Sequence, residues 1–181
     1  MKDELDEYGF PRFEQNSFPL AYLITFRTFG TWLHGDARTS VRRNGNNRYG
    51  GPRVTASVPL SELMRENQKG DPFILDVIQR RCVDSAIKEV CEFRKYLLRA
   101  VNVRTNHAHV VVSASLKPEK IVNDFKVYAT KRLRSERLVD PDGKIWSRGA
   151  SNRYLWKPKH VNGAVDYVKY CQEDIPFEFR D

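Results

Sequence analysis

The sequence has few cysteines and no long apolar segment, and these absences limit the classes of protein to which it can belong. Its 181 residues include only three cysteines, an odd number without metal-type spacing. This favours reduced thiols in a cytoplasmic protein over a disulfide framework. No apolar run is long enough to cross a membrane, and the acidic N-terminus is unlike a signal peptide. We therefore expect a protein without a membrane span, and the length suggests one domain.

Acidic residues are also in deficit. Asp and Glu number 23 against 31 Lys and Arg, which gives a formal net charge of +8 and an isoelectric point near 9.5. Such a balance favours a polyanionic partner, most often nucleic acid, although a merely soluble basic protein would show the same charge. The 40% of hydrophobic residues is enough to build a core.

The order of hydrophobic patterns predicts an α+β fold. A strand is expected at 21–29, a helix from the Asp71-Pro72 pair to about 93 and a hairpin whose first strand is 97–103. The remaining expected elements are a helix at about 119–138, one or two short strands in 145–149 and 153–156, and a helix at about 159–173. This order is typical of a ferredoxin-like βαββαβ antiparallel sheet with helices on one face, here with an added C-terminal helix.

Two segments stand apart from this pattern. Residues 1–19 are polar and contain two prolines, so we expect an extended lead-in to a single domain at 20–175. The stretch at about 37–53 is rich in Gly, Asn and Arg and cannot build a core, which predicts a long loop. Its arginines, Arg42 and Arg43 among them, would suit single-stranded nucleic acid, with a solvated insertion as an equal alternative.

A pair of histidines lies in the predicted hairpin. His107 and His109 open the second strand of the hairpin, just after Asn106. Alternate residues of a strand point to the same face, so the two imidazoles project side by side. Together they could bind one divalent metal ion. The alternative is two unrelated histidines, one packed and one exposed.

The predicted helix at 119–138 combines an apolar stripe with many positive charges. With about 100° between successive residues, Tyr128 falls on the flank of the stripe and Arg132 near its middle. An arginine at a buried-looking position is unexpected. It either extends past the edge of the sheet or faces an anionic group. Lys126 and Lys131 add charge to the same helix, whose stripe consists of Val122, Phe125, Ala129 and Leu133.

These motifs, in this order, resemble the single-tyrosine HUH transposases, in particular their REP-associated tyrosine transposase branch. The matching stretches are 106–112 with the two histidines, 125–133 with a central tyrosine, and 146–149 leading to 160–168. Together they cover most of residues 20–172. The Arg-rich loop falls outside the pattern.

The resemblance implies a metal-dependent endonuclease and strand transferase that acts on single-stranded, hairpin-forming DNA. His107 and His109 would bind Mg²⁺ or Mn²⁺, and Tyr128 would be the nucleophile that forms a 5′-phosphotyrosine intermediate. A homodimer and a nucleoid-associated location in a prokaryotic cytoplasm are also expected. The candidate DNA-binding residues are Arg132, Lys126, Lys131, Arg42 and Arg43.

The third metal ligand departs from the family pattern. The family usually places a polar ligand one turn after the tyrosine, where this chain has Arg132, which cannot bind a cation. Asp124, one turn before Tyr128, is a candidate replacement, and His34 or Asp36 is another. Alternatively Arg132 binds the phosphate and water completes the metal shell.

Arg132 in the place of a metal ligand could also indicate that the protein has lost the ability to cleave DNA. The protein would then be a domesticated DNA-binding protein on the same fold. An RNA-binding ferredoxin-like domain would show exposed aromatic residues on its central strands, which the hairpin lacks. An unrelated metalloenzyme would leave the basic helix and the Arg-rich loop without a role.

Overall fold

The computed structural model describes residues 18–31, 56–68 and 70–171. Most of the predicted lead-in and the whole predicted loop at 37–53 lie outside these residues. Within them the chain forms four strands and four helices. In chain order these are β1 (Ala21–Arg27), α1 (Val58–Glu66), α2 (Val77–Arg94), β2 (Leu97–Val103), β3 (His107–Ser113), α3 (Pro118–Ser135), β4 (Ser151–Leu155) and α4 (Pro158–Tyr170).

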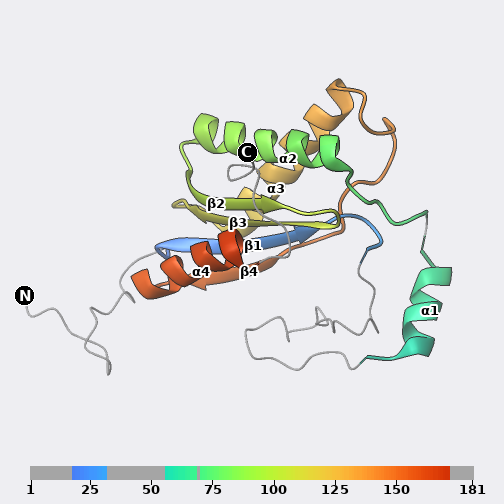
Figure 1. The fold of residues 1–181 in the computed structure, drawn as a ribbon, viewed down its shortest axis with the longest axis horizontal. Coiled ribbons are helices and arrows are strands. Elements are labelled where there is room, and N and C mark those ends of the chain that lie inside the picture. The colour runs from blue at the N-terminus through green and yellow to red at the C-terminus, as the bar shows by residue number, and fades with distance from the viewer. Residues whose placement is uncertain (1–17, 32–55, 69, 172–181) are drawn as a thin grey trace, which may run out of the picture.

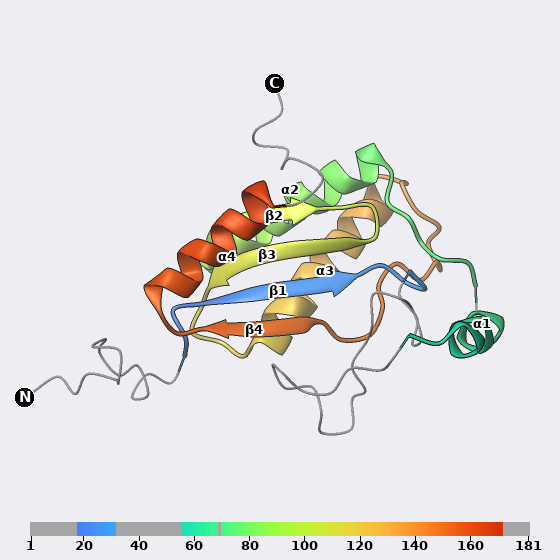
Figure 2. The same cartoon turned by 60° about the horizontal axis from the view of Figure 1, so that its bottom comes forward.

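The four strands form one sheet in the order β2-β3-β1-β4, with every neighbouring pair antiparallel. Figure 2 shows the strands side by side in this order. Because β3 runs between β1 and β2 and opposite to both, β1 and β2 are parallel, and α2 connects them. This arrangement confirms the predicted ferredoxin-like α+β fold.

Helices cover both faces of the sheet (Figure 1). On one face, Ile24 and Phe26 of β1 and Val110 of β3 pack with the buried residues of α2 and α3. On the other, Ala21 of β1 and Val111 of β3 pack against α4 through Val161, Ala164 and Val168. Alternation along each strand therefore divides the side chains between two separate cores.

The first long helix begins later than its sequence signal indicated. Asp71-Pro72 is not its start: Asp76 is the N-cap, and its carboxylate and the Gln79 side chain form a reciprocal capping box. The preceding residues are extended because the backbone N–H of Leu75 donates to the carbonyl of Thr105. The apolar side chains of Ile74 and Ile78, within the helix predicted from the sequence, are 55% and 64% exposed.

Two other segments differ from expectation. The helix α1 was not predicted. It begins at the N-cap Ser57, buries no side chain and lies away from the sheet in both Figure 1 and Figure 2. Residues 145–149 form no strand and contribute only an isolated bridge between Trp146 and Thr28. Within the described residues, every helix is too short or too polar to span a bilayer.

The apolar stripe predicted for α3 is confirmed. Phe125, Ala129 and Leu133 are fully buried, and Val122 is 6% exposed. The Phe125 ring stacks on that of Phe26 with 6.4 Å between centroids. This contact joins α3 to the central strand β1.

Phe125→Ala should destabilise the fold by about 3–5 kcal/mol, because it opens a cavity between α3 and β1. Urea denaturation followed by circular dichroism measures the change. Val127→Ala, at a 51% exposed position of the same helix, is the matched control and should have little effect. Equal losses in both variants would contradict the assignment of Phe125 to the core.

Candidate active site

The two histidines of β3 lie side by side at the start of the strand. Their Nε2 atoms are 3.0 Å apart, and their ring centroids are 4.6 Å apart. His109 is 7% exposed and His107 is half-buried. Both project on the sheet face that α4 covers further along, because Val111 of the same alternation packs in the α4 core.

A hydrogen bond orients each imidazole through its other ring nitrogen. Nδ1 of His107 lies 2.6 Å from Oδ1 of Asn106, and since an amide oxygen only accepts, the histidine donates. Nδ1 of His109 lies 2.8 Å from Oγ1 of Thr25 on β1. When His109 also donates through Nδ1, both Nε2 lone pairs are directed toward each other. Metal-binding histidines are commonly oriented by a hydrogen bond from their other ring nitrogen to a carboxylate, a carbonyl or water.

The turn that carries Asn106 is itself held from β1. The backbone carbonyl of Asn106 accepts from the backbone N–H of Thr28 at 2.9 Å and from its hydroxyl at 3.1 Å. The hydroxyl of Thr31 also lies within bonding distance of this carbonyl, at 3.4 Å. Thr28 and Thr31, just after β1, therefore hold in place the turn whose Asn106 side chain orients the His107 ring.

The donor set fits a divalent metal ion. Two nitrogens that bind one ion at right angles, each at about 2.1 Å, lie about 3.0 Å apart, which is the separation found here. Within residues 18–31, 56–68 and 70–171, no group of three or more His, Cys, Asp or Glu side chains comes together. Among the described residues, the candidate protein ligands for such an ion are therefore the two imidazoles.

Positive charge surrounds the histidine pair. Burial, then the charges of His107, Arg104 and Arg27, lowers the pKa of His109 to about 3. His109 is therefore neutral at physiological pH, as a metal ligand must be. Arg27 lies directly opposite His107 in the β1–β3 pairing. The sequence pattern did not indicate either arginine, because Arg27 reaches His107 only through the pairing of β1 with β3 and Arg104 lies just after β2.

A tyrosine of α4 contacts the histidine pair on this face of the sheet. The ring of Tyr167 meets the ring of His109 edge to face, with 5.5 Å between centroids and 75° between planes. Tyr167 is 41% exposed, so its side chain is accessible from solvent. The site therefore combines two imidazoles, a tyrosine and two guanidinium groups.

Comparison with known proteins identifies the family of the chain. A family model described as "Transposase IS200 like" matches residues 72–169, which is more than half of the chain. The chain belongs to the IS200-like transposase family. No curated protein matches it. The match spans the histidine strand, α3 and the part of α4 that contains Tyr167, and it confirms the resemblance seen in the sequence.

Tyr128 of the transposase, the predicted nucleophile, is not brought to the histidines. It lies on α3, which packs on the opposite face of the sheet with Phe125 and Ala129 in the larger core. Its ring contacts Phe93 of α2, with 6.3 Å between centroids. Tyr128 is thus a boundary residue between two helices. The sequence pattern indicates no role for Tyr167, in the stretch 160–168, because it does not state which face of the sheet each helix covers.

Asp124, the predicted replacement metal ligand, also lies on α3 and so on the other side of the sheet from the histidines. It is 4% exposed and accepts from the hydroxyl of Tyr96 at 2.8 Å, and it forms an ion pair with Lys120 one turn earlier. Burial alone raises the pKa of this carboxyl. The hydrogen bonds from Lys120 and Tyr96 outweigh that effect and hold the pKa below its ordinary value. Asp124 therefore joins α3 to the start of β2.

Arg132, the unexpected arginine of α3, faces carboxylates of the protein itself. Its guanidinium pairs with Glu89 of α2 and, at 2.8 Å, with Glu136. These hydrogen bonds raise its pKa above the ordinary value. The ion pairs explain why an arginine lies beside the apolar stripe, and they leave the proposed role in DNA binding without structural support.

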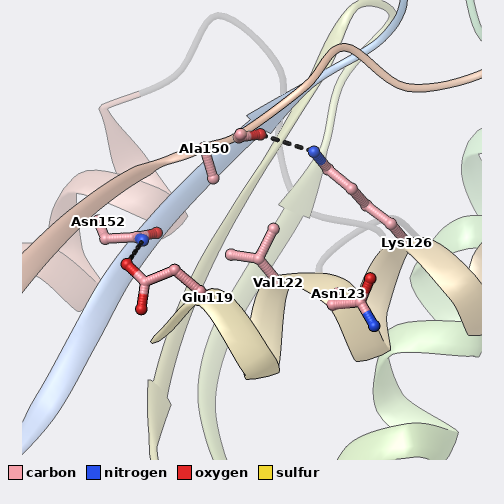
Figure 3. Close-up of a pocket in the computed structure, with 7 residues that line it drawn as sticks. Glu119, Val122, Asn123, Lys126, Ala150 and Asn152 are labelled. Carbon is pink, nitrogen blue, oxygen red and sulfur yellow. Dashed lines mark hydrogen bonds between the residues drawn. The ribbon is translucent and has the colours of Figure 1, made fainter. Parts of the chain in front are cut away.

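The lysines of α3 also lie away from the histidines. Nζ of Lys126 donates to the carbonyls of Ser147 and Gly149, at 2.8 and 2.6 Å, and so holds the segment before β4 to the helix. Figure 3 shows Lys126 extended toward this backbone beside a hollow that Glu119 and Asn152 also line. Lys131 is exposed. Arg42 and Arg43, with His34 and Asp36, lie outside the described residues.

Asp124→Asn should leave Mn²⁺ affinity at the histidine pair unchanged but lower stability. The folded pKa lies below the unfolded one of about 3.9, so the carboxylate stabilises the fold above that pH and loses this contribution as pH falls. The difference in unfolding free energy from wild type should therefore shrink between about pH 6 and pH 3. Calorimetric Mn²⁺ titration and urea denaturation measure the two effects, and a clear loss of Mn²⁺ affinity would restore Asp124 as a ligand.

Proposed function

We propose that this transposase cleaves and rejoins single-stranded DNA with Tyr167 as the nucleophile and a divalent metal ion at His107 and His109. The observation that carries the proposal is the contact of Tyr167 with His109, on the sheet face where the two Nε2 atoms meet. Mg²⁺ or Mn²⁺ is the ion that the family resemblance implies. When bound, it would polarise the scissile phosphate and offset the charge that develops there.

The protein's own groups would position the reacting phosphate. Arg27 and Arg104 are close enough to His109 for their charges to lower its pKa. Guanidinium groups bind phosphate oxygens through paired hydrogen bonds, so these two arginines suit the DNA backbone beside the tyrosine. Contacts of this kind are independent of base sequence. The formal charge of +8 favours the same polyanion.

The covalent step exchanges one phosphate ester bond for another. The phenolic oxygen of Tyr167 attacks phosphorus, a bond from tyrosine to the 5′-phosphate forms, and the bond to the 3′ oxygen breaks. The phenolic proton leaves to solvent and the departing 3′ oxygen takes up a proton. Attack by another 3′-hydroxyl reverses these changes, joins the strands and regenerates the tyrosine. The hairpin-forming DNA implied by the resemblance is the proposed substrate.

Covalent trapping tests the nucleophile and the metal site together. End-labelled single-stranded DNA from the sequence that flanks the gene is incubated with protein and Mn²⁺ and resolved on a denaturing gel. Wild type should give a metal-dependent protein–DNA band, and Tyr167→Phe and His107→Ala should abolish it. Tyr128→Phe is the matched control and should retain the band, because Tyr128 lies on the other face of the sheet.

Two results would contradict this proposal. Loss of the band in Tyr128→Phe with its retention in Tyr167→Phe would return the nucleophile to α3. A wild-type protein that shifts the DNA in a native gel but forms no covalent band would support the non-catalytic, domesticated DNA-binding alternative.

Mixing inactive variants tests whether one chain supplies the whole site. Tyr167 lies against His109 of its own chain, so a mixture of Tyr167→Phe and His107→Ala should form no covalent adduct. The measurement is the same denaturing gel, with each variant alone as the control. Restored adduct in the mixture would show that a second subunit supplies α4, as in the predicted homodimer.

A further inference from the structure

A buried asparagine on β2 holds the last turn of α4 to the sheet. Asn102 is 2% exposed, and its Nδ2 donates to the carbonyl oxygen of Val168 at 3.2 Å. Carbonyls in the last turn of a helix have no backbone partner within that helix. The carbonyl of Tyr167 is satisfied by the backbone N–H of Cys171. Asn102 therefore satisfies the next carbonyl and acts as a C-terminal cap supplied by the sheet.

This hydrogen bond joins the two halves of the proposed site. Asn102 is directly opposite His109 in the pairing of β2 with β3. Val168, at the other end of the bond, immediately follows Tyr167. One side chain thus connects the position of the metal-binding histidine with the helix turn that carries the tyrosine.

The residue type at this position is informative. Its neighbours on the same face, Ala100 and Val111, are buried and apolar and pack against α4. An apolar side chain at 102 would extend that core, whereas a buried amide is costly unless it is hydrogen-bonded. Packing alone therefore does not explain an asparagine here, and its directional bond to α4 does.

We propose that Asn102 is a positioning residue for Tyr167. Its amide keeps the last turn of α4 formed and close to β2, so that the Tyr167 ring stays against His109. Helix ends fray readily without such a partner. A shift of about 1 Å between reacting groups can cost on the order of 100-fold in rate. The inference rests on the proposed role of Tyr167.

The test compares two variants at Asn102 with a control on the same strand. Asn102→Leu keeps a similar volume without a donor, and Asn102→Ala removes the whole amide. Val101→Ala removes core methyl groups from the opposite face of β2, where Val101 is 2% exposed. Each variant is assayed at a temperature where circular dichroism shows it folded, with saturating DNA and Mn²⁺.

Single-turnover adduct formation should slow roughly 10- to 100-fold in both Asn102 variants, with unchanged affinity for DNA and for Mn²⁺. Val101→Ala should keep the wild-type rate despite its lower stability. Backbone hydrogen exchange should speed up in the last turn of α4, 167–171, in Asn102→Leu and stay unchanged in the first turn of that helix.

The outcomes that overturn the inference are distinct. A folded Asn102→Leu that reacts at the wild-type rate would overturn the positioning role and leave Tyr167 as nucleophile. An equal loss of rate in Val101→Ala would reduce Asn102 to a general structural role. A wild type that forms no adduct would overturn the proposed function and this inference together, even if the hydrogen-exchange difference shows that the cap exists.

Discussion

The antiparallel pairing of β3 with β1 and β2 is the constraint on which the candidate site depends. Residues opposite each other in such a pair project to the same face, so Arg27 lies beside His107, and Thr25 and Asn102 flank His109. A shift of one residue in β3 would turn both histidines into the core under α2 and α3. The small, buried Ala108 and the buried Val110 on that side resist such a shift, because histidine rings would not fit their places.

Burial and charge act in the same direction at His109. Both disfavour a protonated imidazole, which leaves the ring neutral and able to bind a metal ion through Nε2. The hydrogen bond with Thr25 offsets part of the cost of burying the polar ring. Arg27 and Arg104, whose charges act on His109, also attract an anion. A divalent ion bound at the histidines, as proposed above, would therefore be accommodated better together with a phosphate than alone.

The charged residues of α3 show how abundant positive charge can serve the fold. Lys126 binds backbone carbonyls before β4, Lys120 pairs with Asp124, and Arg132 pairs with Glu89 on α2. Exposed ion pairs contribute only about 0–1 kcal/mol each. These interactions nevertheless engage Lys126 and Arg132, which the sequence pattern indicates as DNA-binding residues. The histidine face instead takes its positive charge from Arg27 on β1 and Arg104 just after β2.

The sequence alone determined the α+β class, the apolar stripe of α3 and the common face of His107 and His109. Each follows from periodicity, because a period of two or of 3.6 residues assigns side chains to faces within one element. The start of α2 was misplaced because two N-cap signals, Asp71 and Asp76, lie five residues apart. A capping box and the backbone bond of Leu75 favoured the second.

Tertiary structure decided which helix faces the histidines. Tyr128 and Tyr167 lie on amphipathic helices of similar pattern, and nothing in either pattern states which side of the sheet its helix will cover. That choice depends on the path of the chain around the sheet edge and on long-range contacts, such as that of Asn102 with Val168, which link residues 66 positions apart. Local propensity carries no information about such contacts, so the sequence specified the histidine pair and only the fold brought Tyr167 to it.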